Sequence, residues 1–271
     1  MGWIFAILLI LILLAAAYVF ALLPNLPRRP IDHLTGVDYA HRGLWNAIYP
    51  ENSMPAFYNA VRNGYGIELD VHLTKDGQLV VFHDDNLMRM CGVDRNIHDC
   101  TLSELSQMRL MGTDCTIPTF SQVLSVVGGR VPLIVEIKTG PNVPELCEKA
   151  NALLRAYRGS YCMESFDPKA VQWWREHAPG TIRGLLAHGT RGLDKQTLTP
   201  QMYFMETLMH NFIARADFIA YGYKTEPNLP MKVMRLLRPT FVAWTVRSQE
   251  DMDHLRGQYD LQIFEGFIPK R

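Results

Sequence analysis

A chain of 271 residues can bury a large core, and one α/β barrel of ordinary size would use nearly all of it. Its 27 basic and 27 acidic residues balance, so no overall electrostatic field draws the protein to nucleic acid or to an anionic membrane surface. We therefore expect a globular protein with no nucleic-acid partner, apart from one segment whose composition differs.

That segment is the N-terminal run of residues 3–23, which carries no charge. As a helix it would measure about 31 Å, enough to span a bilayer. A cleavable signal peptide is the alternative, with Ala15-Ala16-Ala17 resembling a cleavage site, but no Lys or Arg precedes the run. We expect residues 1–23 to form a retained single-pass anchor in the membrane. Arg28 and Arg29 follow the run, so the positive-inside rule places the large domain in the cytoplasm.

The cysteines are odd in number and include no C-x-x-C pair. They are Cys91, Cys100, Cys115, Cys147 and Cys162. A disulfide framework is not expected in a domain of this size, and the spacing does not suit a zinc site. We expect reduced, structural thiols, which agrees with a cytoplasmic domain.

Residues 24–35 contain three prolines and are interpreted as a linker, after which residues 36–271 alternate short β-branched or aromatic runs with helical patterns. The expected strands are 37–41, 67–73, 131–138, 160–165, 182–187, 217–221, 241–246 and 261–264. The expected helices are 54–63, 119–127, 144–157, 168–177, 200–215, 227–237 and 249–258. Several of these begin with proline or follow a Ser, Thr or Asp cap. Eight strands alternating with helices predict a (β/α)₈ TIM barrel.

One further strand-like run, residues 78–83, follows the second strand after Asp76-Gly77. Asp-Gly between alternating apolar residues predicts a tight hairpin with a two-residue turn. Such a turn pairs Asp70 with His83 and places both on one face with Glu68. The other face then holds the apolar side chains of Ile67, Leu69, Val71, Val80 and Phe82.

Residues 84–118 are richer in Cys, Asn, Asp and Met and break the alternation of strands and helices. We interpret them as a small insertion over the barrel mouth, although an ordinary long connection with one helix near 101–111 explains them equally well. Their large apolar side chains are Leu87, Met88, Met90, Leu102, Leu105, Met108, Leu110 and Met111. These either admit an acyl chain or, as we favour, pack as a core.

Candidate catalytic residues gather at the carboxyl ends of the expected strands, where barrels of this kind form their active sites. They are His41, Glu68, Asp70, Glu136 and Trp244. A single histidine there is more often structural, but two histidines with three carboxylates indicate catalysis. Mg²⁺ and Ca²⁺ prefer the oxygen ligands that Glu68, Asp70 and Glu136 offer, whereas zinc favours His or Cys.

Two basic residues complete the set that phosphodiester cleavage requires. Lys138 shares a strand face with Glu136, either as a simple ion pair or as a fixed positive charge for the transition state. Arg42 can hold a phosphate oxygen through its planar fork, and a surface arginine is the alternative. The presence of the other candidate site residues nearby favours the functional interpretation of Lys138 and Arg42.

Nine motifs carry a family resemblance, in this order along the chain. They are His41-Arg42-Gly43, Pro50-Glu51-Asn52-Ser53, Ile67-Glu68-Leu69-Asp70-Val71, Thr74-Lys75-Asp76-Gly77, Val81-Phe82-His83-Asp84, Ile117-Pro118-Thr119-Phe120, Glu136-Ile137-Lys138, Ser165-Phe166-Asp167 and Trp244-Thr245-Val246. With them, residues 36–269 resemble the glycerophosphodiester phosphodiesterase family, a barrel relative of the phosphatidylinositol-specific phospholipases C. The resemblance implies one metal ion, Mg²⁺ or Ca²⁺, held by Glu68, Asp70 and Glu136. It also implies His41 and His83 as the acid/base pair, phosphate contacts from Arg42 and Lys138, and an apolar wall that includes Trp244.

Two stretches depart from the family pattern. Arg247 follows Trp244-Thr245-Val246 where the family usually has Asn, and Glu265-Gly266-Phe267-Ile268-Pro269 replaces a closing Thr-Asp-x-Pro-like stretch. Both lie near the expected mouth, so they bear on substrate preference more than on the reaction. Glu51 is expected to help fix the first loop rather than to bind the metal.

The function predicted from these residues is metal-dependent hydrolysis of glycerophosphodiesters to sn-glycerol 3-phosphate and an alcohol. Lysophospholipase D-type cleavage of lysophospholipids at the membrane is the alternative, because the anchor brings the barrel to the bilayer. A membrane-tethered binding domain without activity is the third hypothesis, and the presence of every implied site residue argues against it. The alcohol, the choice of cation and the order in which the histidines act stay open.

Overall fold

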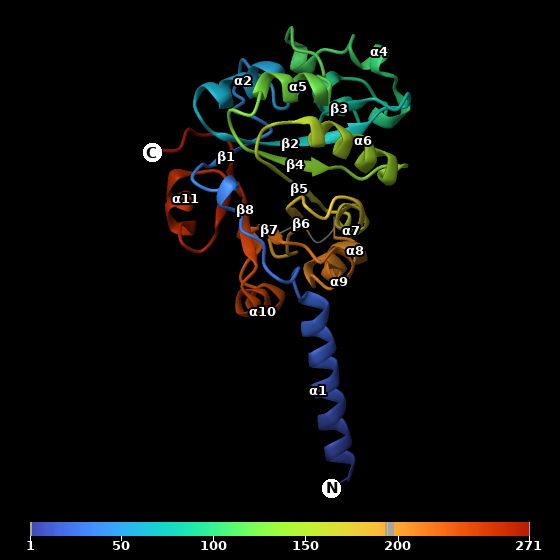
Figure 1. Ribbon diagram of the computed structural model, residues 1–271, viewed down its shortest axis with the longest axis vertical. Helices are drawn as coiled ribbons and strands as arrows, with labels where there is room; N and C mark the ends of the chain where they lie inside the picture. Colours follow the sequence, from blue (N-terminus) through green and yellow to red (C-terminus); the bar gives the residue numbers. More distant parts are fainter. Residues whose placement is uncertain (1, 193, 195–197, 271) are drawn as a thin grey trace.

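Eight parallel strands close a barrel that helices surround (Figure 1). The computed structural model describes residues 2–192, 194 and 198–270; Met1 and Arg271, the end residues of the expected anchor and barrel domains, lie outside this range. The barrel strands are β1 (Tyr39–His41), β2 (Gly66–Leu73), β4 (Leu133–Ile137), β5 (Tyr161–Ser165), β6 (Arg183–Ala187), β7 (Phe218–Gly222), β8 (Thr240–Val246) and β9 (Leu261–Phe264). β1 pairs with both β2 and β9, which closes the ring. These strands are the eight expected from the sequence, so the predicted TIM barrel is confirmed.

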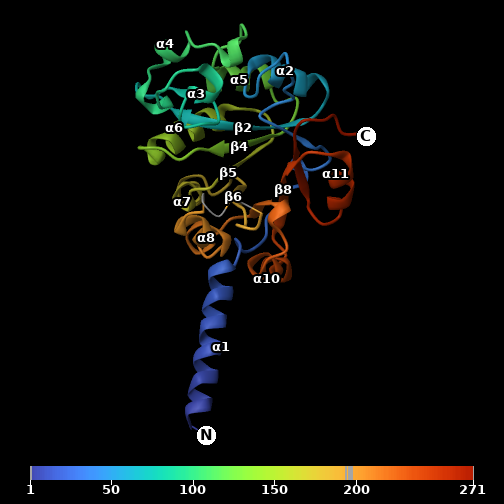
Figure 2. The same ribbon diagram turned by 180° about the vertical axis from the view of Figure 1, so that it is seen from behind.

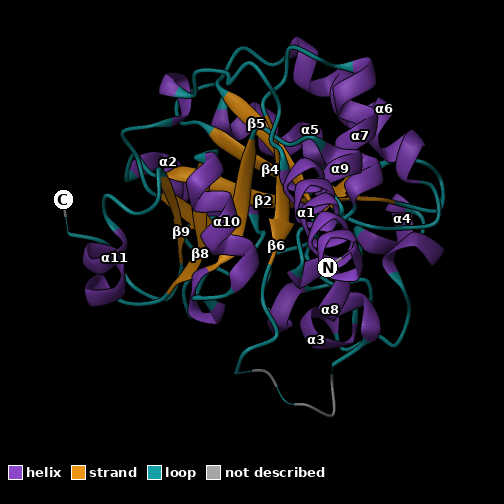
Figure 3. Ribbon diagram, turned by 90° about the horizontal axis from the view of Figure 1, so that it is seen from below, coloured by secondary structure: helices purple, strands orange, loops and turns teal. Residues whose placement is uncertain are grey.

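The helices outside the strands form a nearly complete ring (Figure 3). They are α2 (Met54–Arg62), α5 (Phe120–Val127), α6 (Val143–Ala156), α7 (Pro168–His177), α8 (Pro200–Glu206), α9 (Asn211–Ala214), α10 (Leu229–Leu237) and α11 (Gln249–Leu255). All except α9 begin at a side chain that accepts a backbone N–H of the first turn. These caps are Ser53, Thr119, Asn142, Asp167, Thr199, Asn228 and Ser248. Short 3₁₀ turns lie at Asp32–Leu34, Ile97–Asp99, Leu110–Gly112 and Tyr223–Thr225.

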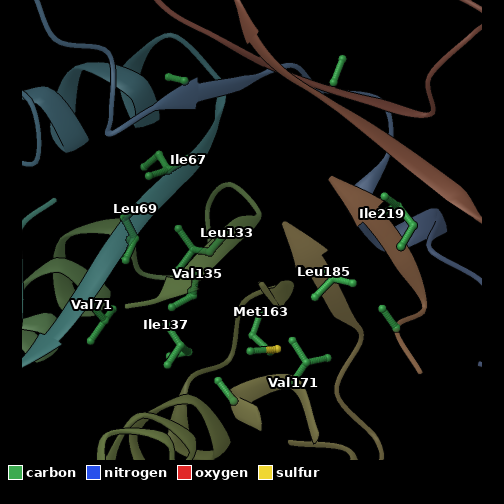
Figure 4. Close-up of a cluster of buried hydrophobic side chains, with 14 of the residues drawn as sticks. Ile67, Leu69, Val71, Leu133, Val135, Ile137, Met163, Val171, Leu185 and Ile219 are labelled. Carbon is green, nitrogen blue, oxygen red and sulfur yellow. The ribbon is translucent and has the colours of Figure 1, made fainter. Parts of the chain in front are cut away.

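Alternation along the strands separates the core from the site. On β2, Ile67, Leu69 and Val71 point outward and pack with side chains of the neighbouring strands and helices (Figure 4). Because successive side chains of a strand point to opposite faces, Glu68 and Asp70 point into the barrel. The same alternation on β4 sends Glu136 inward. The apolar face of each strand therefore fixes where its carboxylates lie.

The predicted hairpin forms, but its register is wrong by one residue. β2 pairs with β3 (Leu79–Val81) so that Leu73 lies opposite Leu79, and the Thr74 N–H donates to the Gln78 carbonyl at 2.9 Å, which leaves a loop of three residues, 75–77, rather than two. The Thr74 hydroxyl accepts the Gln78 N–H at 2.8 Å, and Gly77 takes the third loop position with φ of 72°. The shift turns Val80 and Phe82 away from the β2 core and toward the insertion.

The expected helix 200–215 is also wrong, because it is two helices. α8 and α9 are separated by residues 207–210, where the buried Leu208 has a φ of 58°. A left-handed residue cannot continue a right-handed helix. The turn exposes the Thr207 carbonyl, which accepts a hydrogen bond from Tyr18 at 3.1 Å.

The insertion has its own small core. It contains α3 (Met88–Cys91) and α4 (Leu102–Leu105), and β3 contributes Val80 to the same cluster. Six of its eight large apolar side chains pack there, whereas Met88 and Met111 are exposed. This arrangement supports packing, the interpretation favoured above, over a site for an acyl chain.

Helix α1 (Gly2–Leu22) projects away from the barrel (Figure 2). It is long and apolar enough to cross a membrane, and a signal sequence would have the same properties. Immediately after it the chain is bound to the barrel: the Asn25 N–H donates to the Ala216 carbonyl at 2.9 Å, and Arg29 Nε donates to Asp217 Oδ1 at 2.9 Å. Arg28 donates to the Leu237 carbonyl. The two arginines that follow the apolar run therefore also bind the barrel close to the end of α1.

A buried histidine beside this junction should make the fold sensitive to acid. His210 lies in the turn between α8 and α9, neither ring nitrogen has a hydrogen-bond partner, and burial lowers its pKa to about 4. The unfolded chain binds the proton first as the pH falls, so the free energy of unfolding should decrease by up to about 3 kcal/mol between pH 6.5 and 4. His210→Leu should remove that part of the loss, as measured by urea titrations across this pH range. An unchanged pH dependence in the variant would contradict the assignment.

Candidate active site

The site residues expected from the sequence come together at the carboxyl ends of the barrel strands. His41 ends β1 with Arg42 directly after it, Glu68 and Asp70 lie on β2, and Glu136 lies near the end of β4 with Lys138 just beyond. The chain of β3 continues to His83, and Trp244 lies near the end of β8. Five separate segments therefore supply one cluster.

The three carboxylates form the centre of this cluster. Glu68, Asp70 and Glu136 are buried and each offers an oxygen, all within 4.8 Å of one another. Lys138 Nζ lies 2.9 Å from Glu136 Oε1 and 3.3 Å from Asp70 Oδ1. Lys138 therefore forms the ion pair with Glu136 that was one of the two alternatives for it. Because it also lies beside Asp70, its charge faces the carboxylate cluster. A set of oxygen donors at this spacing can hold a divalent cation.

Burial and neighbouring charges shift the pKa values of the three carboxyl groups in different directions. Burial, with the charges of Asp70 and Glu136, raises the pKa of Glu68, and burial raises that of Glu136 to about 7 against the opposing charge of Lys138. Burial also opposes ionisation of Asp70, but the charges of Lys138, His83 and Arg42 outweigh it and lower the Asp70 pKa. Like charges this close cannot all ionise without a cation. The cluster could therefore hold a cation.

Arg42 is fixed between the first loop and the carboxylates. Its backbone N–H donates to Glu68 Oε2 at 3.0 Å, and its Nη1 donates to Glu51 Oε1 at 2.7 Å. Its Nε lies 3.7 Å from Asp70 Oδ2 and is buried without a hydrogen-bond partner. Asn52 donates to the same Asp70 oxygen at 2.8 Å. Arg42 is thus not a free surface arginine.

His41 is oriented by the two residues that depart from the family pattern. Its Nδ1 lies 2.5 Å from Glu265 Oε2, and Glu265 Oε1 accepts from Arg247 Nε at 2.7 Å. Burial lowers the pKa of His41, and the Glu265 hydrogen bond offsets this in part. His41 and Arg247 hold the pKa of Glu265 at about 2 although burial opposes its ionisation. These contacts from Arg247 through Glu265 to His41 were not predicted, although an acidic and a basic residue at adjacent strand ends were a signal for them.

His83 has a similar arrangement, with a carboxylate and an arginine behind its ring. Its Nδ1 lies 2.6 Å from Asp84 Oδ1, and Asp84 Oδ2 accepts from Arg89 Nε at 2.6 Å. Arg89 belongs to α3 of the insertion and also donates to Glu51, at 2.6 Å from Nη2. Burial lowers the pKa of His83, and the charge of Asp70 offsets this in part. Asp84 and Arg89 were not predicted as site residues.

An aromatic wall stands on one side of the mouth. Trp244 contacts Phe166 and His188, with ring centroids 5.6 and 6.2 Å apart, and its Nε1 is buried without a partner. Phe166 follows β5 and His188 follows β6, so the wall spans the ends of three strands. A fourth inward carboxyl, Glu164 on β5, lies opposite Glu136 and was also missed from the sequence. Burial and the charge of Glu136 raise the Glu164 pKa.

This barrel, with histidines, basic side chains and carboxylates gathered at the carboxyl ends of its strands, is an enzyme of the (β/α)₈ class. The model of the glycerophosphoryl diester phosphodiesterase family matches residues 41–259. A putative glycerophosphodiester phosphodiesterase of Bacillus subtilis is 33% identical over 229 residues, which cover 80% of this chain and 89% of that protein. The chain therefore belongs to the glycerophosphoryl diester phosphodiesterase family, whose members are phosphoric diester hydrolases.

Other relatives agree over parts of the chain or in fold. The rat lysophospholipase D GDPD1 is 36% identical over 121 residues, 40% of this chain and 38% of that protein. A Thermotoga maritima glycerophosphodiester phosphodiesterase structure covers 84% of this chain and 94% of its own, with 28% identity and a TM-score of 0.63. An Oleispira antarctica phosphodiesterase, solved with its product sn-glycerol-3-phosphate, is 22% identical with a TM-score of 0.71, covering 85% and 93% of the two chains.

Proposed function

We propose that this enzyme hydrolyses glycerophosphodiesters to sn-glycerol 3-phosphate and an alcohol by acid/base catalysis with His41 and His83, assisted by a divalent cation. The observation that carries the proposal is a pair of imidazoles near the carboxylate cluster that are oriented in the same way. Each Nδ1 is bound to a carboxylate, which leaves each Nε2 for the reaction. An acid or base group positioned in this way typically increases the reaction rate by roughly 10²- to 10⁴-fold.

One imidazole removes the proton from the attacking hydroxyl or water, and the other protonates the departing alkoxide. Burial lowers both pKa values, which keeps the proton acceptor neutral near pH 7. The negative charge of the bound phosphodiester raises the pKa of the imidazole that it approaches, so that this ring can carry the proton it delivers. A neighbouring glycerol hydroxyl as the first nucleophile would give a cyclic phosphate that water then opens.

The carboxylates Glu68, Asp70 and Glu136 would hold the cation. Their oxygens, their mutual spacing and the raised pKa values of Glu68 and Glu136 fit a hard ion such as Mg²⁺ or Ca²⁺. When bound, the ion supplies positive charge that polarises the phosphoryl group. Arg42 and Lys138 face the same space and would hold phosphate oxygens, while Trp244 forms the apolar wall for the remainder of the substrate.

We also propose that α1 is a retained anchor and that the barrel faces the cytoplasm. The exposed apolar surface of α1 and the basic residues after it support this location. A barrel at the membrane surface meets lysophospholipids as well as soluble diesters. Lysophospholipase D-type cleavage is therefore the second candidate, which the partial similarity to rat lysophospholipase D GDPD1 favours.

The products distinguish the two candidates. Glycerophosphocholine yields sn-glycerol 3-phosphate, whereas lysophosphatidylcholine yields lysophosphatidate, each with choline. Purified full-length enzyme should release sn-glycerol 3-phosphate from glycerophosphocholine faster than lysophosphatidate from lysophosphatidylcholine vesicles. The reverse order would assign the enzyme to lysophospholipids. Failure to turn over either substrate would favour the third hypothesis, the inactive binding domain, although all of the implied site residues are present.

Glu265 should act through the position and basicity of His41. Glu265→Gln is expected to lower kcat by roughly 10-fold or more. It also replaces the charged partner that raises the His41 pKa by a neutral amide, so the limb of the pH–rate profile that His41 controls should move to lower pH: the acidic limb if His41 is the base, the alkaline limb if it is the acid. Glu265→Asp should restore part of the rate. A fall in kcat without movement of either limb would contradict this role and leave Glu265 as a structural residue.

A further inference from the structure

The described chain carries an unusual density of exposed apolar side chains between residues 203 and 213. Five large ones lie on α8, α9 and the turn between them: Tyr203, Phe204, Met209, Phe212 and Ile213. Tyr203, Phe204 and Phe212 are each more than half exposed, at 53%, 52% and 54%. We call these five residues the α8–α9 face. Large apolar side chains exposed together in one short segment indicate contact with a partner or a membrane.

This face lies beside the end of α1 and is fixed there. The Phe20 and Phe212 rings are 5.9 Å apart, and the Arg215 guanidinium lies over both rings, at 4.7 and 5.2 Å. Asn211 Nδ2 donates to the carbonyls of Leu22 and Leu23, each at 3.0 Å. No flexible spacer therefore separates the apolar helix from the barrel. Figure 1 shows α8, α9 and α10 at the end of the domain from which α1 projects, and Figure 2 shows α8 and α10 there from behind.

We propose that the α8–α9 face rests in the interfacial layer of the membrane that α1 spans. This inference depends on the anchor assigned under the proposed function. A spanning helix that ends near Leu22 places Phe20 and Phe212 at the headgroup level, where aromatic side chains of membrane proteins gather. A helix face rich in Phe, Tyr, Met and Ile that lies flat at this level buries apolar surface in the bilayer.

The charges around the face suit a bilayer with anionic headgroups. The three acidic residues between 200 and 238 are all paired: Glu206 accepts from Thr190, Asp217 from Arg29, and Glu226 from Arg235. Over the same range Lys224, Lys232 and Arg238 are exposed. Basic side chains near an anionic surface strengthen binding to it. The exposed basic residues and the apolar α8–α9 face together suit a bilayer with anionic headgroups.

The same element connects the bilayer to the catalytic mouth. The Thr190 hydroxyl, in the loop after β6, donates to Glu206 at the end of α8 at 2.6 Å. His188 of the same loop belongs to the aromatic wall with Trp244. The apolar side of the mouth is thus on the side of the barrel that meets the membrane. A substrate with an acyl chain would reach the site along this edge.

The test uses the full-length enzyme in lipid nanodiscs, labelled with a solvent-sensitive thiol fluorophore at one introduced cysteine. Tyr203→Cys probes the face, and Tyr58→Cys on α2 is the matched control, because the two tyrosines are 53% and 56% exposed. Phe5→Cys in α1 is the positive control, and the parent chain gives the background from Cys91 and Cys115. Lipids that carry a nitroxide near the headgroup quench only labels at the bilayer.

We expect quenching of the labels in Phe5→Cys and Tyr203→Cys and none in Tyr58→Cys. Quenching in Phe5→Cys alone would overturn the docked face while leaving the anchor intact. Absence of quenching in all three variants would overturn the anchor as well. As a second readout, the double variant Tyr203→Ser and Phe204→Ser should lose turnover of lysophosphatidylcholine in vesicles but keep that of soluble glycerophosphocholine. An equal loss on both substrates would contradict delivery along this edge.

Discussion

Replacement of His41 or His83 by Ala is expected to lower kcat/KM for glycerophosphocholine by roughly 10²- to 10⁴-fold in each variant. The reason is geometric: each ring is held by a carboxylate and an arginine so that its Nε2 is available to the reaction. Steady-state kinetics of the two variants, with circular dichroism to establish that both are folded, is the measurement.

A substrate with a better leaving group should separate the two roles. p-Nitrophenolate is a weak enough base to depart without a proton, so a p-nitrophenyl glycerophosphodiester bypasses the general acid. The variant that lacks the acid should recover most of its rate on this substrate, and the variant that lacks the base should not. Unchanged turnover of glycerophosphocholine in the two folded variants would contradict acid/base catalysis by these histidines.

Binding of Mg²⁺ or Ca²⁺ is expected to release protons at pH 7. Burial raises the pKa of Glu136 to about 7 despite Lys138, and that of Glu68 is also raised, so the cluster is partly protonated before the ion arrives. Calorimetric titrations in two buffers of different ionisation enthalpy measure the released protons. At 100 times Kd the ion should also raise the free energy of unfolding by about 2.7 kcal/mol.

Two neighbouring carboxyl groups provide a matched comparison for the ion site. Glu136→Gln should weaken ion binding by roughly 10-fold or more. Glu164→Gln should leave it nearly unchanged, because burial and nearby charge raise the Glu164 pKa and favour a neutral carboxyl, which glutamine resembles. Equal affinity in both variants, or binding without proton release, would contradict the assignment of the cluster as the ion site.

The barrel was predictable because its strands are short runs whose apolar residues must face the surrounding helices. That requirement sends Glu68, Asp70 and Glu136 inward, so much of the candidate site followed from alternation alone. The β2–β3 register was not predictable from Asp76-Gly77, because the Thr74 hydroxyl competes for the turn and adds a residue to it. Because of this shift in register, Val80 lies on the opposite face of the hairpin from the one predicted.

The partners of the two histidines were harder to foresee. Glu265 and Arg247 follow different strands, and only the closure of the barrel brings them to His41. Arg89 reaches Asp84 and Glu51 because the insertion folds back over the mouth on a core of its own. Beside the break at Leu208, the Thr207 carbonyl accepts a hydrogen bond from Tyr18 of α1. Each of these features rests on contacts between segments distant in the sequence.

The most direct test of the proposed activity is release of sn-glycerol 3-phosphate from glycerophosphocholine by the purified full-length enzyme. The assay is run with Mg²⁺, with Ca²⁺, and after treatment with EDTA followed by restoration of each ion. Release that EDTA abolishes and one of the two ions restores is the predicted result. Release that persists undiminished in EDTA, or no release with either ion, would contradict metal-assisted hydrolysis at the Glu68, Asp70 and Glu136 cluster.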